Sequence, residues 1–231
     1  MKRLLLAVLL ALATMPAMAE LSAAMRAIER GHYATALRAL KKPAEQGDPH
    51  AQNNLAYLYE HGLGVAQNDA EAFAWYARAA DAGLPAAQYN LATLYLQGRG
   101  TSPDAERAFD WYEAAARSAY ADAEYMLGEC YRGGVGVKRD PATALSWYLK
   151  AARRGHSAAQ LMAASVFYSG EGWRREPAKA LVWAELARQA GETQAPSLIA
   201  RIARDLRDGQ KAEAIEQALL CKNSGYRDCP E

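Results

Sequence analysis

The sequence has little of several features that mark catalytic or nucleic-acid-binding proteins. Lysine and arginine together number 27 and aspartate and glutamate 26, so the formal net charge is only +1. Polyanion binders usually carry a clear basic excess. No serine is followed by lysine three residues later, and the Gly-x-Ser-x-Gly, His-Glu-x-x-His and Cys-x-x-Cys motifs are absent. We therefore expect no catalytic site, no metal, no cofactor and no nucleic-acid partner.

Long apolar runs are missing as well, except at the start of the chain. Lys2 and Arg3 precede an apolar stretch over residues 4–13, and Ala17-Met18-Ala19 is a small-x-small cleavage site. These features predict a signal peptide over residues 1–19, cleaved between Ala19 and Glu20. The alternative, an uncleaved membrane anchor, is disfavoured because the apolar run is short. The residue directly after the cleavage site is Glu20 and not a cysteine, so a bacterial lipid anchor is not indicated.

A 36-residue repeat occupies most of the remaining sequence. The spacing relates three sets of residues: Trp75, Trp111, Trp147 and Trp183; Gly62, Gly98, Gly134 and Gly170; and Gly64, Gly100, Gly136 and Gly172. A unit of this length cannot bury its apolar face alone and must stack on its neighbours. The sequence therefore predicts an all-α solenoid, whose usual output is a long binding surface.

Each repeat is expected to form a helical hairpin. In the first copy, Ala51, Leu55 and Leu58 lie on one helical face, which defines helix A, and glycines end that helix. Helix B begins at Asn68, and its tryptophan is expected to fill the space between successive hairpins. The predicted organisation is a signal peptide (1–19), an opening hairpin (20–48), four repeats (49–84, 85–120, 121–156, 157–192) and a closing hairpin with a tail (193–231).

The repeat string AQNNLAYLYEHGLGVAQNDAEAFAWYARAADAG, with its counterpart AEYMLGECYRGGVGVKRDPATALSWYLKAARRG, closely resembles the Sel1-like repeat of the tetratricopeptide-like superfamily. The resemblance implies a right-handed α-α superhelix whose A helices line a concave groove and which acts as an adaptor between macromolecules. Exported bacterial members resemble cell-envelope scaffolds. A cysteine-rich exported branch is associated with penicillin binding, but Cys130 has no partner inside its repeat, so this chain departs from that branch.

Three cysteines remain after the signal peptide. Cys221 and Cys229 flank residues that turn easily, and an exported protein meets oxidising conditions, so these two are expected to form a disulfide. Cys130 shares its repeat position with Leu58, Leu94 and Val166 and is expected to be buried and free. The scattered histidines are expected to lie in exposed loops.

Candidate binding residues lie on the face of helix A opposite its apolar stripe. Aromatic side chains interrupted by charge are typical of partner-binding grooves. The predicted groove consists of Tyr57, Tyr89, Leu96, Tyr125, Glu129, Arg132, Leu161 and Tyr168. The alternative is that some of these tyrosines pack sideways onto neighbouring A helices. Trp173 stands where other repeats have Val65, Thr101 and Val137; a buried plug is favoured over an exposed anchor.

The sequence favours a non-enzymatic periplasmic scaffold, with full secretion as the alternative location. Its partner is expected to be an envelope protein or an extended peptide held in the groove. The competing hypotheses are a cell-envelope hydrolase, a β-lactam- or peptidoglycan-binding protein of the cysteine-rich kind, and a polysaccharide-binding module that uses the tyrosines.

Overall fold

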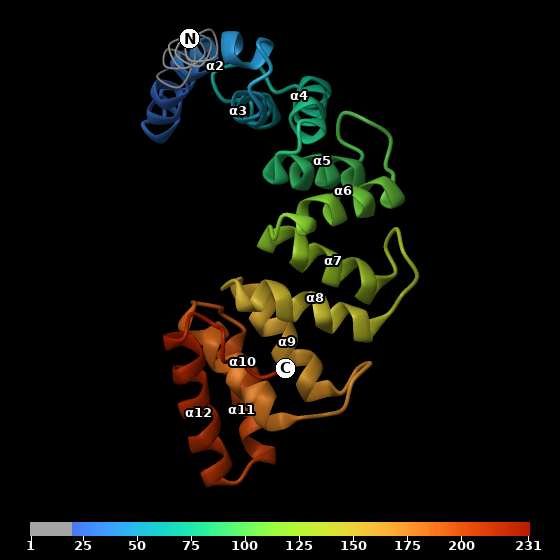
Figure 1. The fold of residues 1–231 in the computed structure, drawn as a ribbon, viewed down its shortest axis with the longest axis vertical. Helices are drawn as coiled ribbons and strands as arrows, with labels where there is room; N and C mark the ends of the chain where they lie inside the picture. Colours follow the sequence, from blue (N-terminus) through green and yellow to red (C-terminus); the bar gives the residue numbers. More distant parts are fainter. Residues whose placement is uncertain (1–19) are drawn as a thin grey trace, which may run out of the picture. The chain divides into compact units, whose positions relative to one another are not determined.

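The computed structural model describes residues 20–231, which form helices joined by short turns (Figure 1). Residues 20–29 are helical and open the first hairpin. The helices that follow are α2 (Tyr33–Glu45), α3 (Pro49–His61), α4 (Asp69–Asp81), α5 (Pro85–Gln97), α6 (Ala105–Arg117), α7 (Ala121–Gly133), α8 (Pro141–Arg153), α9 (Ser157–Ser169), α10 (Pro177–Gln189), α11 (Ala195–Ile202) and α12 (Asp208–Asn223), with a 3-10 turn, η1 (Ala203–Asp205), after α11. The predicted all-α class of repeated hairpins is confirmed. The predicted signal peptide lies outside the described residues.

The helices group into two compact units, one ending at Asp104 and the other comprising Ala105–Glu231. In the first unit α2, α3 and α4 each pack on the next helix in the chain, up to α5. In the second unit α6 to α10 do the same, and both α11 and α12 pack against α10 (Figure 1). Within the described residues, every helix is too short or too polar to serve as a membrane span.

Paired glycines shape the turn between helix A and helix B. The first glycine of each pair ends its A helix in the left-handed conformation, as at Gly62, where φ is 65°. The second allows close stacking of successive hairpins. A Cβ added at Gly100 would lie 2.1 Å from the carbonyl oxygen of Asp69, and one at Gly136 would lie 2.1 Å from that of Ala105. Any side chain there would push the turn off the preceding B helix.

The B helices begin and end with repeated polar and glycine signals. The Asn68 side chain accepts hydrogen bonds from the main-chain N–H groups of Ala70 and Glu71, both at 3.1 Å. After α4 the chain turns at Gly83, where φ is 86°. After α6 the same position is Ala119, which takes a φ of 59°. An alanine in this region costs about 1 kcal/mol more than a glycine.

The large buried side chain of helix B is a tyrosine rather than the tryptophan before it. Tyr76, Tyr112 and Tyr148 are fully buried. The indoles of Trp75, Trp111 and Trp147 are only half-buried, so they fill the space between hairpins only in part; Trp75 packs against the margin of the core. Neighbouring positions on a helix point 100° apart, and here the tyrosine shares the stripe of small alanines that faces helix A. The tryptophan stands at the edge of that stripe.

The fourth repeat differs, because Trp183 is fully buried. The position of the buried tyrosine is taken by Ala184 in this repeat, and the segment around Pro230 covers the indole. The Trp183 Nε1–H donates to the Pro230 carbonyl oxygen at 3.2 Å. The closing segment therefore provides the cover that the first three tryptophans lack.

A buried polar side chain near the start of helix A ties each hairpin to the preceding one. Gln52, Gln88 and Gln160 donate to main-chain carbonyls in the last turn of the preceding B helix, at 3.0, 3.3 and 3.2 Å. The third repeat has Glu124 at this position, and it is 2 % exposed. The Arg154 Nε–H donates to its carboxylate at 2.9 Å. The third repeat thus replaces an amide link with an ion pair.

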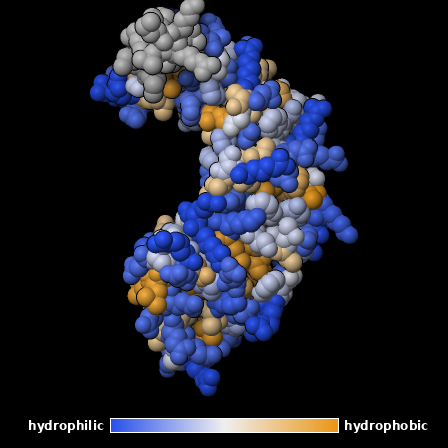
Figure 2. All heavy atoms as spheres, viewed as in Figure 1, coloured by the Kyte–Doolittle hydropathy of each residue, from blue (hydrophilic) through white to orange (hydrophobic). Residues whose placement is uncertain are grey.

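The closing segment is held by a covalent link. The sulfur atoms of Cys221 and Cys229 are bonded, whereas Cys130 is free and buried. Burial, helped by the charge of Glu129, raises the pKa of the Cys130 thiol to about 11, so this thiol stays protonated at neutral pH. Figure 2 shows an apolar patch over α12, the last helix, where Ile215, Leu219 and Leu220 are exposed.

Candidate protein-interaction surface

In the first unit the predicted groove residues belong to α3 and α5. Tyr57 is 41 % exposed, and its ring packs against the imidazole of His61 with centroids 4.2 Å apart. Tyr89 and Leu96 are half-buried. The Asn90 side-chain amide donates to Asn53 at 3.1 Å and so joins the two helices on this face. The face therefore presents one open tyrosine on a surface of polar and half-buried side chains.

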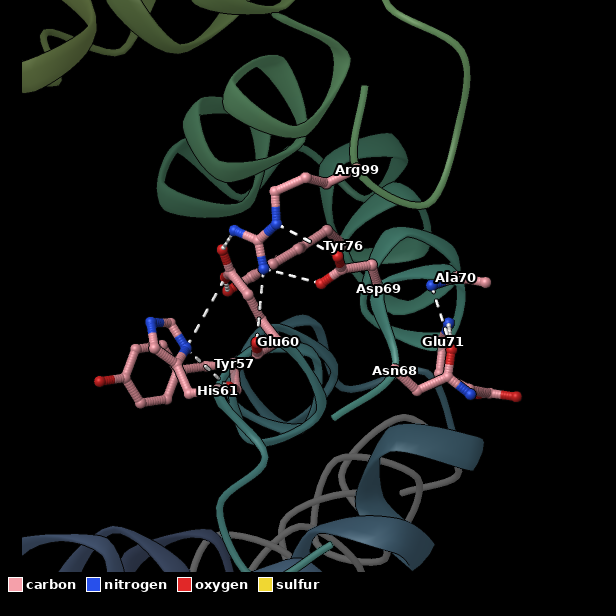
Figure 3. Close-up of polar contacts among 9 residues, drawn as sticks. All are labelled: Tyr57, Glu60, His61, Asn68, Asp69, Ala70, Glu71, Tyr76 and Arg99. Atoms are coloured by element: carbon pink, nitrogen blue, oxygen red, sulfur yellow. Dashed lines mark hydrogen bonds and ion pairs between the residues drawn. The ribbon is translucent and has the colours of Figure 1, made fainter. Parts of the chain in front are cut away.

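Beside this face lies an ionic cluster that joins the first two repeats (Figure 3). Arg99, in the turn after α5, donates to Glu60 at 2.7 Å and to Asp69 at 2.7 Å. Glu60 also accepts a hydrogen bond from the buried Tyr76 hydroxyl at 2.8 Å. The Glu60 side chain is only 14 % exposed, and its carboxylate is bound on two sides. We assign it to the scaffold.

Electrostatics within this cluster favour the charged forms of Asp69 and Arg99 and the neutral form of Tyr76. The pKa of Asp69 lies below its ordinary value, chiefly because Arg99 donates hydrogen bonds to it. The same hydrogen bonds raise the pKa of Arg99. Burial raises the pKa of Tyr76, and the charge of Glu60 adds to this effect, so the phenol stays protonated and keeps donating. The cluster is a fixed structural tie rather than a proton-transfer site.

The second unit has a related arrangement on α7 and α8. The Tyr148 hydroxyl donates to Glu129 at 2.5 Å, and Arg132 pairs with the same carboxylate at 2.5 Å. Burial raises the pKa of Glu129, but the hydrogen bonds from Arg132 and Tyr148 outweigh it, and the net pKa lies below its ordinary value. The guanidinium of Arg132 remains 42 % exposed. The pair leaves the Arg132 side chain partly exposed on the open face of α7, with its charge balanced by Glu129.

The remaining predicted residues of the second unit are half-buried aromatic and aliphatic side chains: Tyr125, Leu161 and Tyr168. The Tyr125 ring stacks on His156 with centroids 4.7 Å apart. The Tyr168 ring lies between two guanidiniums, Arg175 at 5.0 Å and Arg201 at 5.5 Å. Neighbouring side chains therefore hold these rings in place, as the lateral-packing alternative proposed, while each ring stays partly exposed.

The ionic cluster around Arg99 was missed in the sequence, although a signal for it was present. The 36-residue spacing relates Arg99 to Leu63, Val135 and Glu171. An arginine at a position where two other repeats have aliphatic residues indicates an ion pair or hydrogen bond specific to that repeat. Its partners lie 39 and 30 residues earlier in the chain, so only the stacked hairpins bring them together.

Trp173 differs from its expected role. It is 47 % exposed, so the favoured reading of a buried plug was wrong. Its indole N–H donates to Glu176 at 3.3 Å. Among residues 20–231, no group of three histidine, cysteine, aspartate or glutamate side chains is placed to hold a metal ion.

These features define a protein of stacked helical hairpins. The sequence model of the Sel1 repeat matches residues 49–84, 85–120, 121–156 and 157–192. The chain belongs to the Sel1 repeat family. A Sel1 repeat protein from Oxalobacter formigenes is similar at 30% identity and a TM-score of 0.76, over 87% of this chain and 84% of that one.

A second similar structure is c5321, a protective antigen of uropathogenic Escherichia coli strains with the same repeat fold. It is 28% identical with a TM-score of 0.78, and the match covers 90% of this chain but 46% of that one. No curated protein matches the chain. Sel1 repeat proteins generally mediate protein–protein interaction, and the family is typically non-catalytic.

Proposed function

We propose that the protein is a non-enzymatic scaffold of the bacterial periplasm that binds an envelope protein or extended peptide on the open face of its A helices. Membership of the Sel1 repeat family supports protein binding. The periplasmic location is supported by the signal-peptide pattern over residues 1–19, with Lys2 and Arg3 before an apolar stretch and Ala17-Met18-Ala19 after it.

The pre-arranged tyrosines of the A helices carry this proposal. The Tyr57, Tyr125 and Tyr168 rings are each held by a neighbouring imidazole or guanidinium and stay partly exposed. A partner that contacts such rings loses little side-chain entropy, because their positions are already fixed. Tyrosine and arginine are also the residue types that most often dominate binding at protein interfaces.

Site-specific photocrosslinking in intact cells tests the binding face. A benzophenone amino acid at Tyr57 or Tyr168 is expected to give a covalent adduct with a discrete envelope protein. The matched control is the same probe at Trp75, a half-buried helix-B position in the first unit. Adducts formed only from Trp75 would contradict the proposed face.

Cell fractionation and N-terminal sequencing test the location. The mature chain is expected in the osmotic-shock fraction and to begin at Glu20. Recovery of the chain in the cytoplasm with Met1 retained would contradict export.

Turnover assays test the non-enzymatic claim. Purified protein is expected to leave peptidoglycan fragments and a chromogenic β-lactam unchanged over many hours. Sustained hydrolysis of either substrate at enzyme-like rates, if it persists after further purification of the protein, would favour the hydrolase hypothesis.

A further inference from the structure

A cleft on the helix-B side of the second unit has no role in the proposed scaffold surface. It has a volume of about 360 Å³, and it is lined by Leu145, Leu149 and Arg153 of α8 and by the exposed Trp173. The other repeats have valine or threonine in place of this tryptophan. The fourth repeat therefore carries a large aromatic ring that packing within a hairpin does not require.

The cleft combines apolar walls with positive charge. Lys150 and Arg153 both line it, and the Lys150 ammonium lies 3.5 Å from the centre of the Trp147 ring. The Nε–H of Arg153 is buried and has no hydrogen-bond partner among the described residues. The Arg153 side chain as a whole is 32 % exposed, so the rest of its guanidinium can bind an oxygen of a ligand in the cleft.

One acidic residue of the chain already binds to a positive charge of this cleft. The Glu231 carboxylate pairs with an Arg153 terminal nitrogen at 2.9 Å and lines the cleft. The Glu231 main-chain oxygen accepts from Lys179 at 2.5 Å, and the Pro230 carbonyl accepts from Trp183. With the Cys221–Cys229 bond these contacts hold the last residues beside α8 and α10, near the end of the chain in Figure 1.

We propose that this cleft is a second binding site, for an acidic peptide segment that carries an aromatic or large aliphatic side chain. The apolar side chain lies on Trp173 between Leu145 and Leu149. A neighbouring carboxylate binds Lys150 and the Arg153 guanidinium, and it competes with Glu231 for the latter. Tyr125 and Tyr168, the A-helix tyrosines of the same unit, do not line the cleft, so the two surfaces are expected to bind independently.

Fluorescence polarisation of the purified chain with its disulfide intact tests the proposal. The probe is a fluorescein-labelled peptide, Gly-Ser-Glu-Phe-Glu-Leu-Ser-Gly, compared with a counterpart in which both glutamates are glutamine. We expect saturable binding of the acidic peptide. Binding is weakened at least about tenfold by the glutamine peptide, by Arg153→Gln, and by Trp173→Val, which restores the residue of two other repeats.

Variants at two acidic residues sharpen the result. Glu231→Gln frees Arg153 and is expected to raise affinity for the acidic peptide severalfold. Glu216→Gln, an exposed position on α12, makes the same charge change and is expected to leave affinity unchanged. Tyr57→Ala and Tyr168→Ala are also expected to leave it unchanged, which separates this site from the A-helix face.

Thermal melts show whether each variant is folded before binding is compared. No binding of the acidic peptide by the folded wild-type chain would overturn the proposal. Equal affinities for the wild-type chain, Trp173→Val and Arg153→Gln would overturn it too. Equal gains in affinity from Glu231→Gln and Glu216→Gln would show that only the net charge of the protein matters, and would likewise overturn the proposal.

Discussion

The two sides of the A helices differ in how far the repeat constrains them. On the side facing the B helices the same chemistry returns, with Gln52, Gln88 and Gln160 at one position. On the opposite side one position is occupied in turn by Tyr57, Thr93, Glu129 and Ser165. The first side supplies the packing of each hairpin on its neighbour, so changes there cost stability. The second side tolerates variation, and binding specificity is expected to lie there.

The largest expected effect tests the buried side through neighbouring residues of one helix. Tyr112→Ala removes a fully buried ring from α6 and should lower the free energy of unfolding by about 3–5 kcal/mol. Trp111→Ala removes a half-buried ring and should cost about half as much or less. Denaturant unfolding of both variants measures the difference. A larger loss for Trp111→Ala would show that the tryptophan, and not the tyrosine, is the main core residue of helix B.

The second prediction concerns Glu124, the charged residue at the buried position that is glutamine in the other three repeats. Arg154→Ala leaves the Glu124 carboxylate buried without its partner and should cost about 3 kcal/mol. Glu124→Gln restores the amide of the other repeats and should cost less than about 1 kcal/mol. Urea titrations of the two variants compare them directly. Equal losses would show that the ion pair has no special role.

The third effect is a pH dependence at the open face. The folded pKa of Glu129 lies below its ordinary value of 4.5, so its contribution to stability is present above that pH. The contribution is lost as pH falls through the lowered folded pKa. Glu129→Gln should therefore reduce the difference between melting temperatures at pH 7 and pH 3. An undiminished difference would exclude Glu129 as a source of acid sensitivity.

The smallest effect is a gain. Ala119→Gly relieves a left-handed alanine where other repeats have glycine, and should add about 0.5–1 kcal/mol to the free energy of unfolding. Gly83→Ala makes the reverse change at the equivalent position and should cost a similar amount. Thermal melts of this pair compare the two directions. A loss of stability in both variants would show that φ is not the deciding factor.

Much of the fold could be predicted from the 36-residue spacing alone, because glycine turns and alanine stripes have strong local causes. The order of burial within helix B could not. Trp75 and Tyr76 are adjacent large aromatics, and which one enters the core depends on how the next hairpin stacks. The covered Trp183 depends on Pro230, 47 residues away, a contact that no periodicity indicates.

The candidate site was predictable as a set of residues but not as a set of contacts. Helix geometry identifies Tyr57 and Tyr168 as facing away from the core. It does not show that His61 and Arg201 fix their rings, since those positions follow from side-chain packing. Long-range ion pairs such as Arg99 with Glu60 likewise require two stacked hairpins to be in place.

The most direct test of the division between the two sides is the affinity of the crosslinked partner for single variants. Tyr57→Ala and Tyr168→Ala should each weaken binding about tenfold or more, with melting temperatures close to that of the wild-type chain. Trp75→Ala, on helix B, should leave affinity unchanged. Full affinity in both tyrosine variants, together with a loss in Trp75→Ala, would contradict the assignment of binding to the A-helix face.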